Sequence, residues 1–393
     1  MSELFWELKG WELEDPHLKR RNALPFQRTI PFIPVENGLY IIRGPRQIGK
    51  TTWLKEVLSQ KVKAKEKCFY LSCEKVQNSG ELSEILKATR DYGTILLDEI
   101  NYVEGWDKVV KSEIDSGKSK ILMITGSHSV DLRRGADRMP GRFGAGQEFY
   151  LLPMSFSEFL EVRNQAGWNK KTHIENINDY FKIGGFPAAL AEAGPKVQFP
   201  TKTLDTIRRW VVGDFVRLGK QENFVTELMI QLLKTMSSPV SLQTIAKKTS
   251  MGSHNTAQDY ISVLEDCFAL RTLYLVDQNS GSYRFRSNKK FYFRDPILFW
   301  LALKLDGKSY DEKHFEKLAE MVAAEHLCSR YDRVGYFSSP SSGEIDFFRH
   351  DAWALELKWS EIPTNLSKAY LKIALLNKKV WTKKNYLLEW PEM

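Results

Sequence analysis

Short apolar runs alternate with helical patterns in the first third of the chain. The runs are uninterrupted and are flanked by polar or glycine-containing stretches, which is typical of strands buried on both faces of a parallel sheet. The segments between them place apolar residues three and four positions apart, which is the period of an amphipathic helix. The pattern therefore predicts an α/β domain, and its strands are expected at Leu39–Ile42, Cys68–Ser72, Thr94–Leu97 and Ile121–Ile124.

The middle of the chain has a predominantly helical pattern. Ser155 and Glu158 form a capping pattern at the start of a helix, and the residues up to Trp210 are helical apart from a break at the sequence GGFP. Beyond this region, helices separated by short Ser/Gly turns lead into two strand-like stretches, RTLYLV and YRFRS. This order predicts a winged helix whose second helix is Asn255–Phe268.

The last part of the chain returns to a mixed pattern. A helix is followed by three strand-like stretches, by a second helix at Asn365–Leu376 and by a final strand. Changes of pattern along the chain predict four parts, with bounds at residues 1–155, 156–215, 216–300 and 301–393.

The first predicted strand leads into GPRQIGKT, residues 44–51, which matches the phosphate-binding loop pattern GxxxxGK[ST]. Gly44 and Gly49 let the backbone turn tightly, so that successive N–H groups and the N-terminus of the next helix point at phosphates. Lys50 is expected to bridge the outer phosphates, and the Thr51 hydroxyl to ligate Mg²⁺. The alternative, a glycine turn beside a surface lysine, is disfavoured by the strand before the motif and the helix after it. The predicted nucleotide-binding residues here are Gly44, Pro45, Arg46, Gln47, Ile48, Gly49, Lys50, Thr51 and Thr52.

The third predicted strand ends in two acidic residues, Asp98 and Glu99. After a phosphate-binding loop, such a pair is typical of the Walker B motif: Asp98 would hold Mg²⁺ directly or through water, and Glu99 would orient and polarise the attacking water. The fourth strand is followed by Thr125 and Ser127, either of which could sense the γ-phosphate or be an ordinary turn residue. The two motifs together predict ATP and Mg²⁺ as ligands, with Ser127 included in the nucleotide site.

A Gly- and Arg-rich stretch, residues 131–144, is predicted to be an exposed loop. Arg142 is the candidate arginine finger, because a guanidinium brought to the γ-phosphate neutralises charge that develops in the transition state. Arg133 and Arg134 are alternatives for this role, and simply solvated arginines explain the pattern as well.

The composition adds a modest basic bias. Lys plus Arg number 57 and Asp plus Glu 49 in the 393 residues, a net charge of +8, which suits a polyanionic partner such as DNA without requiring one. Near the N-terminus, Arg20, Arg21 and Arg28 could lie close to the nucleotide or a partner, or could be ordinary exposed side chains. A chain of this length has room for two or three domains.

The cysteines and the hydropathy pattern bear on localisation. The four cysteines are scattered and lack CxxC spacing, which is typical of reduced thiols. The sequence has no signal-peptide pattern and no apolar run long enough to span a membrane. These features predict a soluble cytoplasmic protein without a membrane partner.

Several motifs in a fixed order carry a family resemblance. GPRQIGKTT, LLDEI, ITGSHS and GRF are followed by LLPMSFSEFL and GGFPAAL, and the set resembles prokaryotic AAA+ type P-loop ATPases that carry a C-terminal winged-helix and PD-(D/E)xK nuclease-like region. The likeness extends from about Arg28 to about Trp381. It implies ATP binding by the N-terminal domain but gives no substrate. The expected fold is α/β, with an AAA+ like parallel-sheet domain, a helical lid, a winged helix and a restriction-endonuclease-like C-terminal domain.

DNA contact by the winged helix requires cationic and amide side chains at the start of its second helix and on the wing. That helix also carries Asp259, Glu265 and Asp266, which are a poor match for phosphates. Binding of a protein partner, or packing within the chain, therefore remains an alternative. The candidate DNA-contacting residues are His254, Asn255, Gln258, Arg284, Arg286, Lys289 and Lys290.

Acidic and basic residues recur in the C-terminal part. Asp346 lies in the strand-like GEIDFF, and Glu356 and Lys358 lie in ALELK, where alternation puts them on one face of a strand. With Glu325 on the preceding helix, this D…ExK arrangement looks like the PD-(D/E)xK nuclease core. Asp346, Glu356 and Glu325 would then bind a divalent metal, usually Mg²⁺, while Glu356 and Lys358 would serve catalysis, Lys358 by activating water or stabilising the phosphate. The alternative is a salt-bridge network on a half-exposed sheet.

Three functional hypotheses follow from these patterns. The first is a Mg²⁺-dependent ATPase whose nucleotide cycle moves a C-terminal module that acts on DNA. The second is an ATP-driven signalling switch whose C-terminal domains bind a protein partner, with an inactive nuclease-like domain. The third, a nucleotide kinase or other phosphotransferase, is disfavoured because the acidic pair followed by a sensor strand indicates water as the nucleophile. Proteins of this type often form rings, so an oligomer is compatible with every hypothesis.

Overall fold

The structure is a computed structural model of the chain. It describes residues 5–117, 120–126, 129–169, 171–363, 365–373, 375 and 377–388, with residues 129 and 130 described by their backbone alone.

The chain divides into two compact units. Unit 1 consists of Met1–Asn169 and Phe186–Ala191, and unit 2 of Lys170–Gly185 and Glu192–Met393. The division falls inside the stretch predicted as a helical lid, whose helices are therefore shared between the units. The four predicted domain bounds stay a prediction.

Unit 1 is built on a parallel sheet of five strands in the order β2-β3-β4-β1-β5. The apolar runs seen in the sequence form four of these strands, and β5 is a short addition that pairs with β1. Strand β4, which is predicted to lead into the sensor residue, lies between β1 and β3. Strand β1 precedes the phosphate-binding loop, and β3 ends in the acidic pair. The strands are β1 (Gly38–Arg43), β2 (Cys68–Ser72), β3 (Thr94–Asp98), β4 (Ile121–Thr125) and β5 (Glu148–Tyr150).

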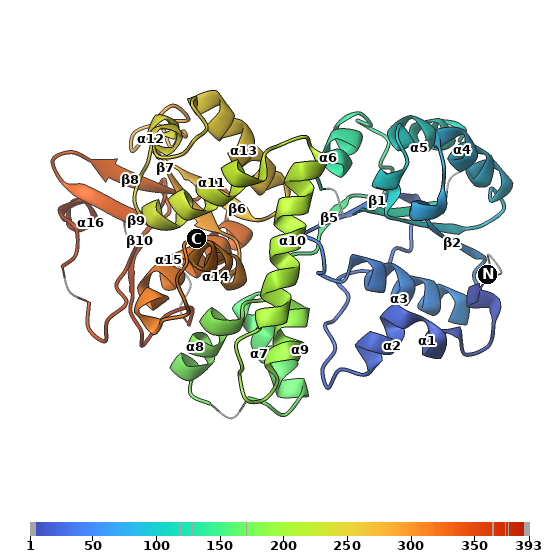
Figure 1. Cartoon of the computed structure of the whole chain (residues 1–393), viewed down its shortest axis with the longest axis horizontal. Helices are drawn as coiled ribbons and strands as arrows, with labels where there is room; N and C mark the ends of the chain where they lie inside the picture. The colour runs from blue at the N-terminus through green and yellow to red at the C-terminus, as the bar shows by residue number, and fades with distance from the viewer. Residues whose placement is uncertain are drawn as a thin grey trace. The chain divides into compact units, whose positions relative to one another are not determined.

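Helices cover both faces of this sheet, as a parallel sheet requires (Figure 1). On one face α3 packs on the strands, α2 packs on α3, and α1 packs on α2. On the other face α4, α5 and α6 contribute to the core. Alternate residues of β1 serve the two faces, so Leu39 and Ile41 belong to the core under α4 and α5. The helices of unit 1 are η1 (Phe5–Glu7), α1 (Trp11–Glu14), α2 (Pro16–Asn22), α3 (Lys50–Lys63), η2 (Cys73–Lys75), α4 (Ser79–Ala88), η3 (Ile100–Tyr102), α5 (Trp106–Asp115), α6 (Ser129–Asp137) and α7 (Phe156–Gln165).

Helix α6 corrects the prediction of an exposed loop over residues 131–137, whereas residues 138–144 form turns and irregular backbone as predicted. Leu132, Ala136 and Met139 are buried at helical spacing and join the core beside the sheet. Gly135 is tolerated inside the helix because a Cβ atom there would lie 2.2 Å from the ring of Trp106. The glycine therefore marks a close approach between α6 and α5 rather than a turn.

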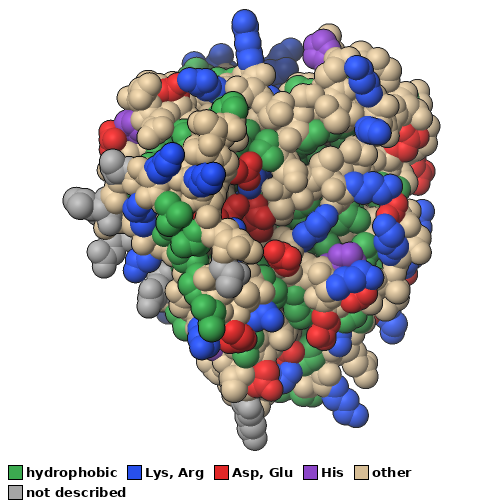
Figure 2. Space-filling view, turned by 90° about the vertical axis from the view of Figure 1, so that its left-hand side faces the viewer, with side chains coloured by type: hydrophobic (Ala, Val, Ile, Leu, Met, Phe, Trp, Pro, Cys, Tyr) green, Lys and Arg blue, Asp and Glu red, His purple; other side chains and the backbone are tan. Residues whose placement is uncertain are grey.

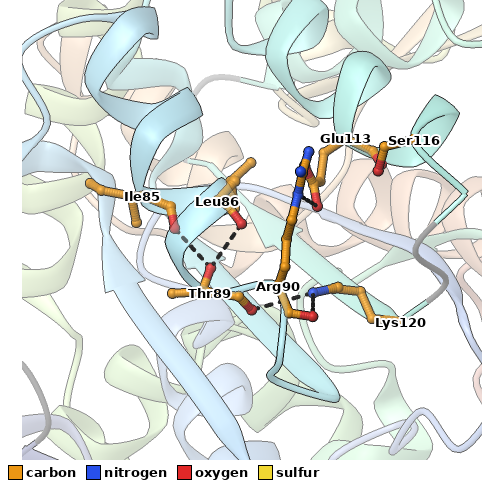
Figure 3. Close-up of polar contacts among 7 residues, drawn as sticks. All are labelled: Ile85, Leu86, Thr89, Arg90, Glu113, Ser116 and Lys120. Carbon is orange, nitrogen blue, oxygen red and sulfur yellow. Dashed lines mark hydrogen bonds and ion pairs between the residues drawn. The ribbon is translucent and has the colours of Figure 1, made fainter.

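Polar contacts fix the end of α4 to its neighbours (Figure 3). The ammonium of Lys120 donates to the carbonyl oxygens of Thr89 (3.3 Å) and Arg90 (3.0 Å), and Arg90 in turn forms a two-pronged ion pair with Glu113 of α5. A cation at the C-terminus of a helix satisfies carbonyl groups that lack partners within the helix. These contacts tie the residue before β4 and helix α5 to the end of α4.

Helix α7 begins with the capping box expected from the sequence. The Ser155 hydroxyl accepts a hydrogen bond from the Glu158 N–H, and the Glu158 carboxylate accepts one from the Ser155 N–H. This prediction is confirmed.

Unit 2 is organised around a buried helix, α14. Its apolar residues are buried on all sides, which explains why its sequence shows no polar stripe. The Trp300 indole N–H donates to the carbonyl oxygen of Phe181 at 2.8 Å, which ties α14 to α8. The helices of unit 2 are α8 (His173–Ile183), α10 (Thr201–Arg217), α11 (Glu222–Thr235), α12 (Leu242–Lys247), α13 (His254–Asp266), α14 (Pro296–Leu305), η4 (Glu312–His314), α15 (Phe315–Arg330) and α16 (Lys368–Lys372), while α9 (Pro187–Ala193) runs from unit 1 into unit 2.

The glycine pair of GGFP has a structural explanation. Asp295 caps α14, and its carboxylate accepts hydrogen bonds from the N–H groups of Ile297 (2.9 Å) and Gly185 (2.7 Å). A Cβ atom on Gly184 would lie 2.2 Å from that carboxylate, and the residue has φ +81°. Only glycine fits this approach.

The elements from α11 to β7 follow the order expected of a winged helix, an assignment that stays a prediction. Helices α11, α12 and α13 precede an antiparallel pair, and α13 coincides closely with the helix predicted at Asn255–Phe268. The second strand, however, lies at KKFYF and not at the predicted YRFRS. The strands are β6 (Leu270–Tyr274) and β7 (Lys289–Phe293).

The C-terminal elements also follow the expected order. After α15 come three strands, the short helix α16 and a last strand, and the sheet order is β11-β10-β9-β8. Strands β8, β9 and β10 are antiparallel neighbours, whereas β11 runs parallel to β10. The strands are β8 (Gly335–Ser339), β9 (Gly343–Arg349), β10 (Trp353–Leu357) and β11 (Asn377–Trp381).

Among the described residues, no helix combines the length and hydropathy needed to cross a bilayer.

Candidate functional site

The loop between β1 and α3 has the backbone of a phosphate cradle. Gly44 has φ +157° and Gly49 φ +106°, and a Cβ atom on Gly44 would lie 2.0 Å from the Leu151 carbonyl oxygen. Side chains are therefore excluded where the sequence pattern places glycine. Lys50 begins α3, is buried, and donates from its ammonium to the carbonyl oxygens of Gly44 (3.0 Å) and Pro45 (2.8 Å). The loop thus holds a positive charge at the N-terminus of a helix, where anions are favoured.

The end of β3 supplies a fixed carboxylate. Asp98 is 3 % exposed, and its two oxygen atoms accept hydrogen bonds from the hydroxyls of Tyr70 (2.9 Å) and Thr125 (2.5 Å). Glu99 follows with φ +53°, in the left-handed region, which costs a residue with a side chain about 1–2 kcal/mol. The Glu99 side chain is half-buried, and its backbone N–H donates to the Thr125 hydroxyl at 3.4 Å.

A cavity of about 1220 Å³ in unit 1 joins the two motifs. Residues 46–52 of the phosphate-binding loop and of α3 line it, together with both acidic residues at the end of β3. The remaining walls come from the N-terminal segment, from the region after β2, and from the start of α9. Its lining residues include Asp15, His17, Arg20, Arg21, Phe26, Arg28, Ile30, Arg46, Lys50, Thr51, Thr52, Tyr70, Ser72, Asp98, Glu99, Leu151, Pro187 and Ala191.

The N-terminal segment is fixed against α3 by buried charges. Lys55 of α3 and Asp15 form an ion pair of 2.5 Å, and each residue is 6 % exposed. The Trp6 indole N–H donates to the Cys68 carbonyl oxygen at 3.1 Å. Burial, followed by the nearby Lys55 ammonium, lowers the pKa of His17. These contacts make the segment a permanent wall of the cavity, a role that no local sequence pattern revealed.

The three N-terminal arginines line the cavity, and two of them have partners. Arg21 pairs with Glu56 of α3 at 2.5 Å, and Arg28 pairs with Glu158 at 3.0 Å. Of the two readings that the sequence left open, proximity to the nucleotide cavity is therefore the one that the geometry favours.

The structure does not bring Arg142 to the cavity. Its guanidinium donates to Asp115 (2.9 Å) and to the Pro140 carbonyl oxygen (3.2 Å), and it is absent from the cavity walls. Arg133 and Arg134 are exposed on α6. Ser127 lies outside the described residues. Thr125, the other sensor candidate, is fully buried with its hydroxyl on Asp98.

The residues at the cavity suit Mg²⁺. Asp98 and Thr51 offer a carboxylate and a hydroxyl to the same space. Magnesium takes hard oxygen ligands and usually keeps several waters, so it needs only one or two protein ligands beside substrate phosphates. This donor set and the roomy cavity fit such an ion.

Residues 36–160 match the family model described as AAA domain. This segment contains all five strands of the unit 1 sheet and both motifs. A second model, a domain of unknown function (DUF8612), matches residues 174–309.

The chain is similar to other proteins over most of its length. An uncharacterized protein of Haemophilus influenzae is 27 % identical over 357 residues, which cover 85 % of this chain and 84 % of that protein. The protein MJ1544 of Methanocaldococcus jannaschii is 26 % identical over 294 residues, covering 70 % and 64 %. Among solved structures, the Walker-type ATPase PABY2304 of Pyrococcus abyssi has a TM-score of 0.48 and 13 % identity, covering 75 % of this chain and 95 % of that one.

Unit 2 has a smaller groove of about 550 Å³ where α12, α13 and the strands β6 and β7 with their connecting segment meet. It gathers His254, Gln258, Arg286 and Lys289 from the set predicted to contact DNA. Arg284, in contrast, is paired with Asp277. Figure 2 shows one face of the molecule, on which Lys and Arg side chains are scattered among acidic ones and form no continuous basic band. The groove also contains aromatic residues, of which Phe285 is 63 % exposed.

The C-terminal sheet brings part of the D…ExK set together. The Glu356 carboxylate pairs with the Lys358 ammonium at 2.9 Å and accepts a hydrogen bond from the Ser367 hydroxyl at 2.5 Å. Asp346, on the neighbouring strand β9, accepts a hydrogen bond from the Leu357 N–H at 2.9 Å. Glu356 and Lys358 thus meet as an ion pair, and Asp346 contacts the backbone N–H of the residue between them.

Glu325 does not join this network. Its carboxylate receives the guanidinium groups of Arg271 and Arg294, each at a shortest distance of 2.6 Å. Burial alone would raise the pKa of Glu325, but Arg294 and Arg271 lower it to about 2. The helix residue that reaches the Asp346 region is Glu320, five positions earlier on α15. Glu325 is therefore a partly buried structural ion-pair partner in this geometry, and we do not propose it as a metal ligand.

A buried lysine also enters the network. The Lys290 ammonium lies 3.0 Å from Glu320, 2.6 Å from Glu344 and 3.7 Å from Asp346. Burial would lower the pKa of Lys290, but Glu320 and its neighbours raise it well above the ordinary value. Burial, followed by Glu320, raises the pKa of Asp346 to about 7. Lys290 is thus a charged, buried member of the cluster, although the sequence made it a candidate for DNA contact.

The residues of this cluster do not fit a divalent metal as found. Among the described residues, no group of three or more His, Cys, Asp or Glu side chains has the geometry to hold a metal ion. The Glu320, Glu344 and Asp346 carboxylates converge on an ammonium instead. The nuclease chemistry predicted from D…ExK therefore lacks its metal centre in this arrangement.

Proposed function

We propose that the protein binds ATP with Mg²⁺ in the unit 1 cavity and hydrolyses it. The observation that carries the proposal is the convergence of the phosphate-binding loop, Asp98 and Glu99 on one cavity, and these residues lie in the segment that matches the AAA domain model. A buried lysine at a helix N-terminus binds phosphates, and carboxylates at the end of a nearby strand of the same sheet suit metal and water.

Each motif residue has a distinct role in this proposal. Main-chain N–H groups of the loop bind the phosphates, and Lys50 neutralises charge on the outer phosphate as the bond to the leaving group breaks. Thr51 and Asp98 would hold Mg²⁺, which when bound supplies charge neutralisation between the phosphates. Glu99 orients a water and accepts its proton. The hydrogen bonds from Tyr70 and Thr125 keep Asp98 in place for this role.

Replacing Glu99 by glutamine tests the hydrolysis step. Because the amide keeps the shape of the carboxylate but cannot accept the proton, ATP turnover is expected to fall about 10²–10⁴-fold while ATP affinity changes little. Steady-state phosphate release and nucleotide titration measure the two effects. Glu104→Gln, an exposed residue five positions on, is the matched control. Wild-type turnover in Glu99→Gln would assign the base role to another group.

A second function, contact with DNA through the unit 2 groove, is favoured by one observation. Four side chains of the kind that contact phosphates and bases share this groove with exposed Phe285. His254 and Gln258 come from α13, Lys289 begins β7, and Arg286 lies in the segment before it. The rival is a protein partner, which the acidic residues of α13 favour. An ATP-driven change in either contact would make unit 1 a switch.

The double variant Arg286→Gln/Lys289→Gln distinguishes the two partners. Loss of two phosphate contacts is expected to weaken DNA binding at least about tenfold and to lower the salt-dependence slope by about 2. Fluorescence anisotropy with labelled duplex and single strands at several salt concentrations measures both. Lys234→Gln/Lys313→Gln removes the same charge elsewhere in unit 2 and is the control. Absence of DNA binding by the wild type at low salt would favour the protein partner.

A further inference from the structure

The carboxylate cluster around Lys290 joins three elements of unit 2. Glu320 comes from α15, Glu344 and Asp346 come from β9, and the lysine comes from the wing strand β7. The lysine side chain is 0 % exposed, whereas the carboxylate side chains are 13–27 % exposed. The cation therefore lies on the inner side of the cluster, with the carboxylates between it and solvent.

The carboxylates supply the charge and the acceptors that the ammonium needs. An ammonium group has three N–H donors and no acceptor. Glu320 and Glu344 lie within hydrogen-bonding distance of it, at 3.0 Å and 2.6 Å, and Asp346 adds a longer ion pair at 3.7 Å. A buried lysine is tolerated only when it is paired and hydrogen-bonded, and a buried group of carboxylates needs a cation in the same way. The ammonium thus neutralises the carboxylates, and the carboxylates neutralise the buried ammonium.

The lysine is held at this position by its own strand. Lys290 pairs with Leu273 of β6, and the residues after it, Phe291 and Tyr292, are each 1 % exposed. The Tyr292 hydroxyl donates to the same Glu320 oxygen that faces the ammonium, at 2.5 Å. Moving the ammonium out would break the strand pairing or expose this core.

The remaining groups of the D…ExK pattern are also engaged. Glu356 is paired with Lys358 and bonded to Ser367, and Asp346 accepts the Leu357 N–H. Mg²⁺ needs oxygen ligands at about 2.0–2.1 Å in a nearly octahedral arrangement. Such an ion could not share the three carboxylates with an ammonium at 2.6–3.7 Å, because the two cations repel each other and compete for the same oxygen atoms.

We propose that the Lys290 ammonium is the resident cation of this cluster, standing where a divalent metal would otherwise bind, so that the cluster fastens the wing to the C-terminal sheet and does not cleave phosphodiester bonds. The C-terminal sheet is then a supporting or binding module. This inference concerns unit 2 and is independent of ATP hydrolysis in unit 1.

The wild-type protein provides the first test. Mn²⁺ is titrated by calorimetry and by electron paramagnetic resonance in the absence of nucleotide, into wild type and Asp346→Asn. The two proteins are expected to bind the same number of Mn²⁺ ions, and neither is expected to nick plasmid DNA in Mn²⁺. One additional ion bound by the wild type, lost in Asp346→Asn, would overturn the proposal, as would nicking lost in that variant.

The variant Lys290→Met provides the second test. Methionine keeps most of the side-chain length but leaves three carboxylates without their cation, so a Mn²⁺ site should appear and the melting temperature, lowered by the substitution, should rise by several degrees on adding Mn²⁺. Lys313→Met, whose side chain is 69 % exposed, is the control and should show neither effect. A folded Lys290→Met that binds no additional Mn²⁺ would contradict the proposal. If this variant does not fold, the comparison of wild type with Asp346→Asn decides.

Discussion

The variant Lys50→Ala is expected to lose ATP turnover by at least about 10²–10³-fold, the usual effect of removing one charged group that stabilises a transition state. The reason is positional. Lys50 is buried at the first residue of α3, beside the carbonyl oxygens of the phosphate-binding loop. The other described lysines on the cavity wall lie outside this loop and cannot replace it. Phosphate release under saturating ATP measures the loss.

The control for Lys50→Ala lies on the same helix. Lys63 ends α3, its side chain is 70 % exposed, and it does not line the cavity. Lys63→Ala should therefore turn over ATP like the wild type. Equal turnover in Lys50→Ala and Lys63→Ala would mean that the loop does not bind the phosphates.

Replacing Glu325 by glutamine is expected to destabilise unit 2 by up to about 3 kcal/mol, because it leaves the partly buried guanidinium groups of Arg271 and Arg294 without their counter-ion. The Arg294 and Arg271 side chains are 10 % and 22 % exposed. Urea unfolding followed by far-ultraviolet circular dichroism measures the change. Glu316→Gln, an exposed position on the same helix, should change stability by less than about 0.5 kcal/mol.

The same variant has a defined pH dependence. The Glu325 pKa is lowered from 4.5 to about 2 in the folded protein. The carboxylate therefore contributes stability above about pH 4.5, and this contribution is lost as the pH falls toward 2. The stability difference between wild type and Glu325→Gln should shrink over that interval. A difference that stays constant, or one no larger than that of Glu316→Gln at neutral pH, would contradict the ion-pair role.

The parallel sheet of unit 1 could be predicted because its strands are buried on both faces. Such strands are unbroken apolar runs, and their bounds follow from composition alone. The phosphate-binding loop and the acidic pair were found for a related reason: each lies next to a strand end, so the order of strands brings them together. The phosphate-binding and acidic residues at these strand ends could therefore be predicted without knowledge of long-range contacts.

Helix α6 was missed although a signal for it exists. Leu132, Ala136 and Met139 have helical spacing and are buried. The Gly and Arg residues between them are typical of loops, and they favour a loop over a helix when the sequence is considered alone. Gly135 belongs there because Trp106 packs against the helix, a contact that cannot be inferred from the local sequence.

The C-terminal cluster shows where sequence reasoning reaches its limit. Glu320 and Glu325 lie on one helix, five positions apart, and thus differ by about 140° around its axis. Only the packing of α15 decides which of them faces the sheet. Lys289 and Lys290 are adjacent on β7, so they point to opposite sides, and the choice of the buried one depends on the register of the wing.

The N-terminal wall of the nucleotide cavity depends on contacts far apart in the chain. Asp15 meets Lys55, and Trp6 meets the first residue of β2. No periodicity within residues 5–31 encodes these pairings. Arg20, Arg21 and Arg28 could therefore be named as candidates but could not be placed.

Titration of a non-hydrolysable ATP analogue with Mg²⁺ into the wild-type protein, followed by calorimetry, tests the central claim most directly. The account predicts saturable binding of one nucleotide per chain in the cavity lined by Lys50, Thr51 and Asp98, and loss of that binding in Lys50→Ala. Absence of binding by the wild type, or undiminished binding by Lys50→Ala, would contradict it.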